Sequence, residues 1–340
     1  MLSRAQAFPR LRYMGSKYAL LPHLERVFAQ VGGRTAVDAF SGSGVVSYLM
    51  KAQGFEVTSN DFMNFAATIA QATVVNSREL LPLDVVDSIC GPSADDRDFI
   101  QNKFRGLYFT PDDLAFLDSA WSHIERLTGH QRDIAISALV LSAARKQPRG
   151  VFTFTGTRYI DGRRDLRLSL REHFIERVAE YNATVFDTPA VHTAVHGDVF
   201  NLSATSPDLV YLDPPYAPPR DDADYMKRYH FLEGLSCYWQ GVEIMEETKT
   251  KKIAKRYTPF AYKRSVEEAL SRTFQKFENA GAIVMSYSSN ALPGAERIVE
   301  LLRDFKPNVE VLSIDHRYHF GTHAAATRRS VSEYLFIGRN

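Results

Sequence analysis

Cysteine, long apolar runs and net charge are all scarce in this sequence. Only two cysteines occur, Cys90 and Cys237, and their separation matches neither a disulfide nor a metal-binding spacing, which favours reduced thiols in a cytoplasmic protein. No apolar stretch approaches the roughly 18 residues that a membrane-spanning helix needs. The first residues do not have the pattern of a signal peptide. We therefore expect a cytoplasmic protein without a membrane partner.

Size and charge narrow the class further. The chain has 340 residues, a formal net charge of +1 and 45% hydrophobic residues, so it can form one large domain or two with a substantial core. Because the chain as a whole is not basic, any nucleic-acid surface must be local. We find no internal repeat, no Ser/His/Asp or Cys/His nucleophile pattern and no set of metal ligands, so we expect no metal site.

The most informative stretch is Leu-Val-Tyr-Leu-Asp-Pro-Pro-Tyr. Residues 209–212 are typical of a strand buried on both faces, and Pro214 and Pro215 end it because they lack an N–H and fix φ. Asp213 and Tyr216 therefore lie at the carboxyl end of a strand, where ligands bind in open α/β sheets. An acceptor carboxylate, a free carbonyl and a flat ring suit a planar group that carries an amine, such as a nucleobase.

A second motif, Phe-Ser-Gly-Ser-Gly at 40–44, lies between a predicted strand and a predicted helix. Glycines there let the backbone approach a ligand, and the start of a helix favours anionic groups. Asp38 precedes the motif, and Asp61 ends the next predicted strand about 20 residues later, where a carboxylate can accept ribose hydroxyls. The full GxGxxG spacing and the GxxxxGK[ST] motif are missing, so neither a dinucleotide site nor a P-loop is favoured.

Hydrophobic patterning predicts an α/β fold. A strand at 35–40, a helix at 45–53 and a strand at 55–59 form a βαβ unit, which implies a parallel sheet. Apolar residues at helical spacing predict helices at 18–30 and 62–76. Further strands are predicted at 191–196, 209–212, 282–286, 309–314 and 331–337, with helices at 265–279 and 293–305.

The pattern changes between the two parts of this sheet. Residues 77–185 are mostly helical, and we interpret them as an inserted subdomain. The sheet domain would then comprise residues 1–76 and 186–340. Within the insertion, helices are predicted at 112–128, 132–146 and 170–182, and a short strand with a hairpin partner at 150–156.

Three motifs in a fixed order carry a resemblance to a known family. Arg-Tyr-x-Gly-x-Lys at 12–17, Phe-x-Gly-x-Gly at 40–44 and Asp-Pro-Pro-Tyr at 213–216 resemble the DNA adenine methyltransferases of the alpha motif order, the Dam-like family. The resemblance covers roughly 10–76 and 190–340. It implies a Rossmann-like methyltransferase sheet, with the helical insertion as a target-recognition subdomain. It also implies site-specific transfer of a methyl group from S-adenosylmethionine to the exocyclic N6 of adenine in duplex DNA.

The resemblance further implies roles for individual residues. Lys17 would lie near the carboxylate of the methyl donor, Asp61 would hold its ribose hydroxyls and Asp198 would face its adenine. The implied cofactor site comprises Tyr13, Gly15, Lys17, Asp38, Phe40, Ser41, Gly42, Gly44, Asp61 and Asp198. The implied pocket for the target base comprises Asp213, Pro214, Pro215 and Tyr216.

The chemistry of the reaction agrees with this pocket. An exocyclic amine is a poor nucleophile because its lone pair delocalises into the ring. Hydrogen bonds from N6 to the Asp213 carboxylate and the Pro214 carbonyl would localise that lone pair and direct it at the methyl group. A base inside a duplex must first be flipped out, which costs a few kcal/mol. Stacking on Tyr216 would offset part of that, by roughly 1–3 kcal/mol.

Two local basic runs, 145–171 and 249–264, stand out against the neutral total. Both suit contact with DNA phosphates, and the first also suits readout of base edges by arginine. A solvated charged face is the alternative for each run. The segment between Tyr216 and the second run could be a mobile flap over a flipped base, although Trp239 suits the core equally well. The DNA contacts that we predict are Arg145, Lys146, Arg149, Arg158, Arg163, Arg164, Lys251 and Lys252.

Several alternatives stay open. The chain could methylate cytosine N4 or RNA, or it could be a non-catalytic DNA-binding subunit of a modification system. Asp213 in place of serine or asparagine favours adenine by the pattern of the family, and the basic insertion favours duplex DNA. The presence of Lys17 and Asp61 argues against a non-catalytic subunit. The resemblance makes a cognate restriction endonuclease a candidate partner and the bacterial nucleoid the expected location.

Overall fold

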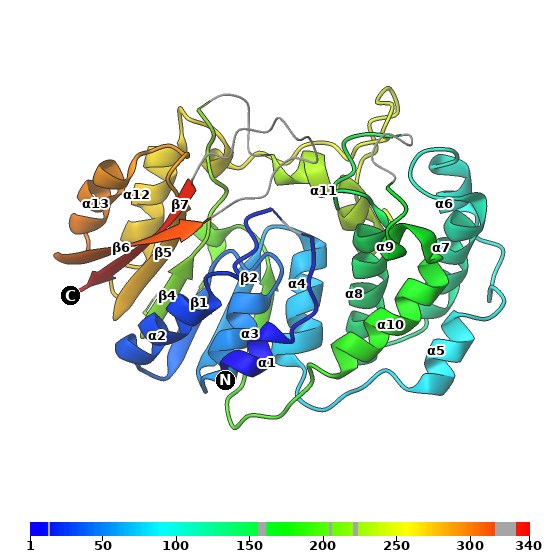
Figure 1. Ribbon diagram of the computed structural model, residues 1–340, viewed down its shortest axis with the longest axis horizontal. Coiled ribbons are helices and arrows are strands. Elements are labelled where there is room, and N and C mark those ends of the chain that lie inside the picture. The colour runs from blue at the N-terminus through cyan, green and yellow to red at the C-terminus, as the bar shows by residue number, and fades with distance from the viewer. Residues whose placement is uncertain (13, 156–160, 204–205, 220–223, 317–330) are drawn as a thin grey trace.

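A seven-stranded sheet forms the centre of the protein, in the order β3-β2-β1-β4-β5-β7-β6 (Figure 1). The structure is a computed structural model that describes residues 1–12, 14–155, 161–203, 206–219, 224–316 and 331–340. The strands are β1 Thr35–Asp38, β2 Glu56–Asp61, β3 Thr193–His196, β4 Leu209–Leu212, β5 Ala282–Ser288, β6 Asn308–His316 and β7 Val331–Arg339. All seven strands predicted for the sheet are therefore present.

The sheet is parallel except at one edge. The strands from β3 to β5 pair in parallel, whereas β7 is antiparallel to both β5 and β6. From β1 the chain moves outward through β2 to β3, and it then returns to the other side of β1 with β4. The strand order thus reverses between β1 and β4. In open α/β sheets, ligands bind at such a reversal, outside the carboxyl ends of the strands.

Helices cover both faces of the sheet. Successive strand residues face opposite sides, so Ala36 and Val284 belong to one core while Val37 and Ile283 belong to the other. The first core is covered by α2 (Leu21–Val31) and α3 (Val45–Ala52), and the second by α12 (Val266–Lys276) and α13 (Ala295–Arg303). This three-layer arrangement confirms the predicted Rossmann-like α/β class.

Two helical segments differ from the prediction. A short helix, α1 (Leu2–Gln6), precedes the first predicted helix and was not predicted. The helix predicted at 62–76 is α4 (Asn64–Ala70), followed by a π-helix, η1 (Gln71–Val75). The buried ammonium of Lys51 donates to the carbonyls of Thr73 and Asn76 at 3.1 and 2.7 Å. These bonds satisfy carbonyls that the end of a helix leaves without intrahelical partners.

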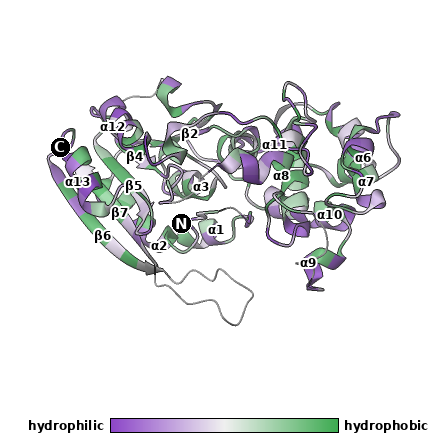
Figure 2. Ribbon diagram, turned by 90° about the horizontal axis from the view of Figure 1, so that it is seen from above, coloured by the Kyte–Doolittle hydropathy of each residue, from purple (hydrophilic) through white to green (hydrophobic). Residues whose placement is uncertain are grey.

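The other helices form a separate group, which we call the helical lobe (Figures 1 and 2). It lies at the opposite end of the molecule from β6. At its centre, α8 is buried along most of its length and contacts α10, α7, α11 and also α4 of the sheet domain. The lobe comprises α5 Leu83–Ile89, α6 Phe99–Lys103, α7 Pro111–Ile124, α8 Gly129–Lys146, α9 Arg164–Arg167, α10 Leu170–Asn182 and α11 Tyr225–Ser236.

The strand and hairpin predicted at 150–156 are wrong for the part that the structure describes, because residues 150–155 form no strand. Phe152 is fully buried and stacks on Phe231 of α11, with ring centroids 4.8 Å apart. Its N–H donates to the Arg228 carbonyl at 2.9 Å. The alternation of apolar and polar residues therefore reflects one buried anchor in a loop and not a sheet.

The flap interpretation of the segment after Tyr216 is also wrong for α11. This helix is buried in the lobe. The side chain of Trp239 is 6% exposed, and its ring centroid lies 4.7 Å from that of Phe104 and 5.1 Å from that of Phe231. The Trp239 ring occupies the space beside Gly234 where a Cβ would lie. The alternative prediction, that Trp239 packs in the core, is thus confirmed. The lobe includes a helix that the predicted 77–185 boundaries omit.

Across the described residues, no helix combines the length and apolar character that crossing a membrane requires.

Candidate active site

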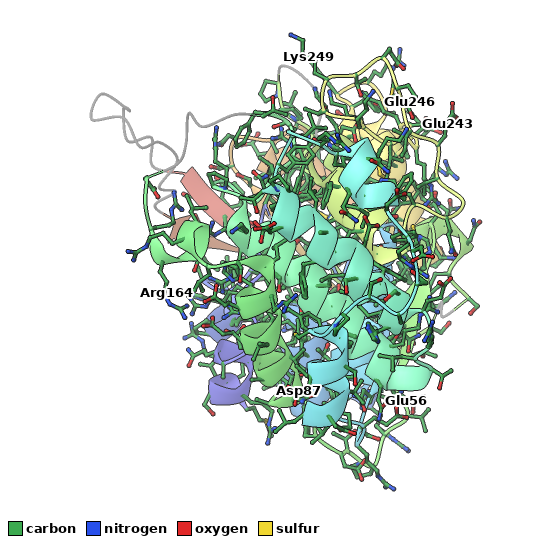
Figure 3. The ribbon with its side chains drawn as sticks, turned by 90° about the vertical axis from the view of Figure 1, so that its right-hand side faces the viewer. Glu56, Asp87, Arg164, Glu243, Glu246 and Lys249 are labelled. Carbon is green, nitrogen blue, oxygen red and sulfur yellow. The ribbon has the colours of Figure 1, made fainter. Side chains whose placement is uncertain are left out.

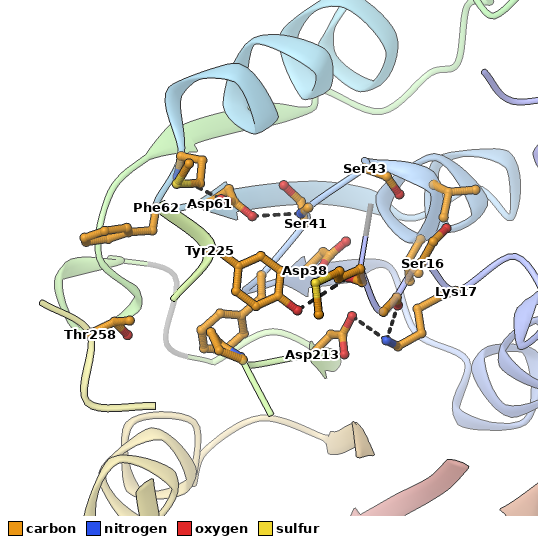
Figure 4. Close-up of a pocket in the computed structure, with 18 of the residues that line it drawn as sticks. Ser16, Lys17, Asp38, Ser41, Ser43, Asp61, Phe62, Asp213, Tyr225 and Thr258 are labelled. Atoms are coloured by element: carbon orange, nitrogen blue, oxygen red, sulfur yellow. Dashed lines mark hydrogen bonds and ion pairs between the residues drawn. The ribbon is translucent and has the colours of Figure 1, made fainter. Parts of the chain in front are cut away.

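A pocket lies at the carboxyl ends of β1, β2 and β4 (Figure 4). Each of these strands contributes one carboxylate to its wall: Asp38, Asp61 and Asp213. The empty space within it is about 840 Å³, a volume that includes open solvent. The lining residues are Met14, Gly15, Ser16, Lys17, Asp38, Phe40, Ser41, Gly42, Ser43, Val45, Val46, Asp61, Phe62, Met63, Tyr211, Asp213, Pro215, Asp224, Tyr225, Met226, Arg256 and Thr258.

The glycine loop between β1 and α3 forms one side of the pocket. Gly42 and Gly44 have φ of +50° and +82°, a region that favours glycine. Asp61 fixes the loop, because its Oδ2 accepts the Gly42 N–H at 2.7 Å and its Oδ1 accepts the Met63 N–H at 2.8 Å (Figure 4). A Cβ at Gly44 would also lie 3.3 Å from Ile69. Gly44 therefore shapes the turn from behind the pocket.

Burial perturbs the carboxylates of the pocket. Burial raises the pKa of Asp38 to about 7. The hydrogen bond that the Ser47 hydroxyl donates to this carboxylate, at 2.6 Å, acts in the opposite direction and lowers the pKa. Burial likewise raises the pKa of Asp61 to about 6, although the backbone N–H groups of Met63 and Gly42 favour the charged form. Perturbed groups in a cleft are typical of functional sites.

Asp213 lies at the centre of a polar network. Its Oδ2 is 2.8 Å from the Lys17 ammonium, and its Oδ1 accepts hydroxyl hydrogen bonds from Tyr216 at 2.9 Å and Ser286 at 3.0 Å. Burial raises the pKa of Asp213, and the neighbouring Lys17 opposes that rise. The sequence predicted Asp213 and Tyr216 for the target base and Lys17 for the methyl donor. The structure brings all three together.

A second carboxylate, Glu333 of β7, belongs to the same network. Its side chain is 1% exposed, its Oε1 accepts a hydrogen bond from the Tyr216 hydroxyl, and the same oxygen is 3.6 Å from Lys17 Nζ. The sequence analysis missed this residue. A charged residue within the apolar run of β7 was the available signal, because charges are rarely fully buried unless they are paired.

The helical lobe supports the loop that carries Lys17. The Met14 N–H donates to the Tyr229 hydroxyl at 2.7 Å, and the Tyr225 hydroxyl donates to the Met14 carbonyl at 3.4 Å (Figure 4). Tyr225 and Tyr229 are four residues apart and therefore lie on one face of α11. This spacing was visible in the sequence, but nothing in it indicated that the partner was the Lys17 loop.

The structure brings most predicted cofactor residues to the pocket. Gly15, Lys17, Phe40 and Ser41 line it, together with the residues described above. Asp198 is not among the lining residues, and its carboxylate accepts the Phe200 N–H at 3.0 Å to cap a short 3-10 helix. Tyr13 lies outside the described residues. Of the residues predicted for the target base, Asp213 and Pro215 line the pocket, whereas Pro214 and Tyr216 do not.

Several polar atoms of the pocket lack partners. The hydroxyls of Ser16 and Ser41 and Oδ1 of Asp38 are buried and make no hydrogen bond. Buried polar groups are almost always satisfied, so unsatisfied ones in a cleft call for a polar ligand. These donors and acceptors fit a nucleoside that carries charged groups. Within the ranges that the structure describes, no cluster of three His, Cys, Asp or Glu side chains could hold a metal ion.

The first basic run is largely engaged with carboxylates of the lobe. Lys146 is 3.1 Å from Asp113, a carboxylate with a 4% exposed side chain. Arg145 lies 3.7 Å from Asp165, and Arg164 pairs with Glu176. Arg163 likewise pairs with Asp161, whereas Arg149 is exposed and Arg158 lies outside the described residues. Lys146 therefore has a structural partner that the sequence did not show.

The second basic run reaches the mouth of the pocket. Arg256 and Thr258 line the pocket, and the Arg256 guanidinium lies 4.3 Å from the centre of the Phe62 ring. The Lys251 ammonium lies 3.2 Å from the Glu246 carboxylate. The side chain of Lys252 is partly buried. On the outer face of the lobe, Arg164 lies well apart from Lys249 and Glu246 (Figure 3). The two runs therefore occupy different parts of the surface.

A Rossmann-like sheet with carboxylates at the ends of β1, β2 and β4, a glycine loop and a lysine loop has the features of a nucleotide- or nucleoside-binding α/β enzyme. Residues 13–110 match the family model described as D12 class N6 adenine-specific DNA methyltransferase. The resemblance found in the sequence is therefore confirmed, and the chain is an adenine-specific DNA methyltransferase that uses a methyl donor and acts on DNA.

Named relatives agree with this identification. The chain is 25% identical over 349 residues to the Type II methyltransferase M2.HphI of Haemophilus parahaemolyticus, and the match covers 98% of both chains. It is 22% identical to the modification methylase LlaI of Lactococcus lactis subsp. lactis and 24% identical to the modification methylase StsI of Streptococcus sanguinis. These two matches cover 90% and 96% of this chain but 51% of each relative.

Proposed function

We propose that the chain transfers a methyl group from S-adenosylmethionine to N6 of an adenine that has been flipped out of duplex DNA at a specific sequence. The observation that carries this proposal is the position of Asp213, at the end of β4, in the same pocket as the glycine loop, Asp38 and Asp61 (Figure 4). One pocket thus contains both an acceptor for an amine and the features of a nucleoside site.

The methyl donor would occupy the part of the pocket next to the glycine loop. S-adenosylmethionine supplies an electrophilic methyl group on a sulfonium sulfur. Asp61 and Asp38 are placed to accept hydrogen bonds from its hydroxyl and amino groups, and the unsatisfied hydroxyls of Ser16 and Ser41 offer further partners. Four carboxylates and two cationic side chains line the pocket, and this excess of negative groups makes it complementary to a positively charged sulfonium.

Asp213 would act on the target amine. Its carboxylate, with the Pro214 carbonyl, accepts the N6 hydrogens and so localises the lone pair towards the methyl group. As the new N–C bond forms, the bond between the methyl carbon and sulfur would break and leave its electron pair on sulfur. N6 would then gain positive charge, which the Asp213 carboxylate would stabilise. Asp213 is then placed to accept the proton that N6 releases. Tyr216, whose ring packs on Tyr287 with centroids 4.8 Å apart, is the proposed stacking surface for the flipped base.

The DNA would contact the rim of this pocket and the helical lobe. Arg256, which is exposed and lines the pocket, supports a contact between DNA and the run 249–264. The lobe, proposed here as the target-recognition subdomain, offers a further surface through its arginines, among them the exposed Arg149. The names of the relatives, a Type II methyltransferase and two modification methylases, support a cognate restriction endonuclease as partner.

The test is transfer of labelled methyl from S-adenosylmethionine to duplex DNA of mixed sequence, with the product digested to nucleosides. We expect N6-methyladenine from the wild type and a loss of about 100- to 1000-fold with Asp213→Ala, because one preorganised electrostatic partner is removed. Asp87→Ala, at an exposed carboxylate on the lobe, is the matched control.

Three outcomes would contradict the proposal. Equal transfer by Asp213→Ala would exclude the mechanism. Label found in cytosine or only in RNA would change the substrate. No transfer by the wild type to any DNA, with retained DNA binding, would favour a non-catalytic subunit.

A further inference from the structure

Glu333 is a buried carboxylate that the proposed reaction has not used. It lies on β7 opposite Ser288 of β5, on the same face of the strand as Leu335 and Ile337. Its side chain is 1% exposed, and its Oε2 has no hydrogen-bond partner. Burying a carboxylate in an apolar core is unfavourable unless other groups compensate for the lost water. A function at the adjacent site explains why a charge is placed there.

The Asp213 carboxylate is crowded by donors. The Ser286 hydroxyl donates to Oδ1, the Tyr216 hydroxyl lies 2.9 Å from the same oxygen, and the Lys17 ammonium lies 2.8 Å from Oδ2. Tyr216 has a single hydroxyl hydrogen, which it can direct either at Asp213 or at Glu333. An incoming N6 amine must compete for this acceptor. The Lys17 charge also opposes the positive charge that develops on N6, because both would lie beside the same carboxylate.

Glu333 contacts two of these three donors. Its Oε1 accepts a hydrogen bond from the Tyr216 hydroxyl and lies 3.6 Å from Lys17 Nζ. Two carboxylates around one ammonium carry a net charge of −1, whereas Asp213 and Lys17 alone would be neutral. Only the first arrangement leaves a negative charge for the amine.

We propose that Glu333 is a positioning residue for methyl transfer: it is the alternative acceptor for Lys17 and Tyr216, and it thereby leaves the Asp213 carboxylate available to the target amine. The inference rests on the proposed function. When the amine docks, the Tyr216 hydroxyl stays on Glu333 and Lys17 moves towards the same carboxylate. Ser286, which has no contact with Glu333 in this network, remains on Asp213 and keeps it oriented.

The first test is Glu333→Gln, which keeps the size of the side chain and removes its charge. We expect kcat to fall by about 10- to 100-fold, because Lys17 then pairs with Asp213 alone and neutralises the charge that the target amine needs. The Kd of S-adenosylmethionine should change less than threefold, since Glu333 does not line the pocket. Glu310→Gln, on the neighbouring strand β6 and exposed, is the matched control and should keep the wild-type kcat.

A second variant separates charge from packing. Glu333→Asp keeps the charge but shortens the side chain, so it should retain more activity than Glu333→Gln. If Glu333 only filled space, the isosteric glutamine would be the more active variant, and this order would overturn the proposal. Wild-type kcat in Glu333→Gln would also overturn it, as would an equal loss of donor affinity and kcat. If Glu333→Gln does not fold, the test relies on kcat of Glu333→Asp alone. A wild-type kcat in Glu333→Asp would then refute the proposal that the contacts of Glu333 with Lys17 and Tyr216 are required.

The two proposals fail in different ways. If the wild type transfers no methyl group to DNA, the proposed function is wrong. If the wild type is active and Glu333→Gln is equally active, only the role of Glu333 is wrong.

Discussion

Charged side chains are used differently in the pocket and in the helical lobe. The pocket is lined by Asp38, Asp61 and Asp213, and Glu333 lies 3.6 Å from the Lys17 ammonium. Two of these carboxylates, Asp38 and Glu333, keep an oxygen without a hydrogen-bond partner. In the lobe, basic side chains face carboxylates of the lobe itself, as in the pairs Lys146–Asp113 and Arg164–Glu176. The lobe satisfies its charges when the chain folds, whereas the pocket leaves some of them for a ligand.

This difference separates stability from function. Removing one partner of a buried ion pair lowers the free energy of unfolding strongly. A buried charge without a partner also lowers it, until a ligand binds and supplies the partner. We therefore expect substitutions in the lobe to alter the free energy of unfolding, and substitutions in the pocket to alter chemistry and pH dependence. Three predictions test this comparison, from the largest expected effect to the smallest.

Lys146→Met should lower the free energy of unfolding by about 3 kcal/mol, because it leaves the Asp113 carboxylate buried without its cation. The measurement is urea denaturation, with methyl transfer per folded molecule as a second readout that should not change. Lys103→Met is the control, since the exposed pair Lys103–Glu246 should contribute less than about 1 kcal/mol. Normal stability with a salt-dependent loss of DNA affinity would restore Lys146 as a DNA contact and break the comparison.

Asp38→Asn should change the pH dependence of stability. The pKa of Asp38 is about 7 in the folded protein, above its ordinary value of 3.8, so the native state binds more protons between these values. Wild-type stability therefore falls as pH rises through this range. Between pH 5 and pH 8 the variant should gain about 2 kcal/mol relative to the wild type. Denaturation at both pH values is the measurement, with the exposed Asp87→Asn as control, and a pH-independent difference would contradict it.

Arg256→Ala should weaken DNA binding by about 3- to 10-fold and reduce the salt dependence by about one phosphate contact. Arg164→Ala should weaken it less than twofold, because Arg164 is paired with Glu176 and lies apart from Lys249 of the second basic run. The measurement is DNA affinity at several salt concentrations, with S-adenosylmethionine affinity as a check on folding. A larger loss in the Arg164 variant would show that the ion pair between Arg164 and Glu176 breaks when DNA binds. The sequence prediction of Arg164 as a DNA contact requires this.

The sheet and the carboxylates at its edge were predictable because local rules determine them. Asp38, Asp61 and Asp213 each end a strand whose apolar pattern marks its boundary, and parallel strands bring their carboxyl ends to one edge. Gly42 and Gly44 were predictable for the same reason. Their position between a strand and a helix is local information.

The partners of these residues were not predictable, because they depend on contacts between distant segments. Glu333 reaches Lys17 across 316 positions of the chain through the pairing of β7 with β5. The partner of Lys146 is set by the packing of α7 against α8, and a basic run in a sequence does not show which of its charges are neutralised. The strand predicted at 150–156 failed because Phe152 packs on α11, which is distant in the sequence.

The contact of α11 with Met14 has a consequence for exchanging specificity between related enzymes. Tyr229 and Tyr225 hold the loop that carries Lys17, and Glu233 of the same helix accepts the N–H groups of Asn64 and Phe65 at the start of α4. A chimera that took 77–185 from one parent would separate these contacts from the lobe in which α11 is packed. The unit suitable for transplantation is therefore the insertion together with α11, with the Met14 loop from the same parent.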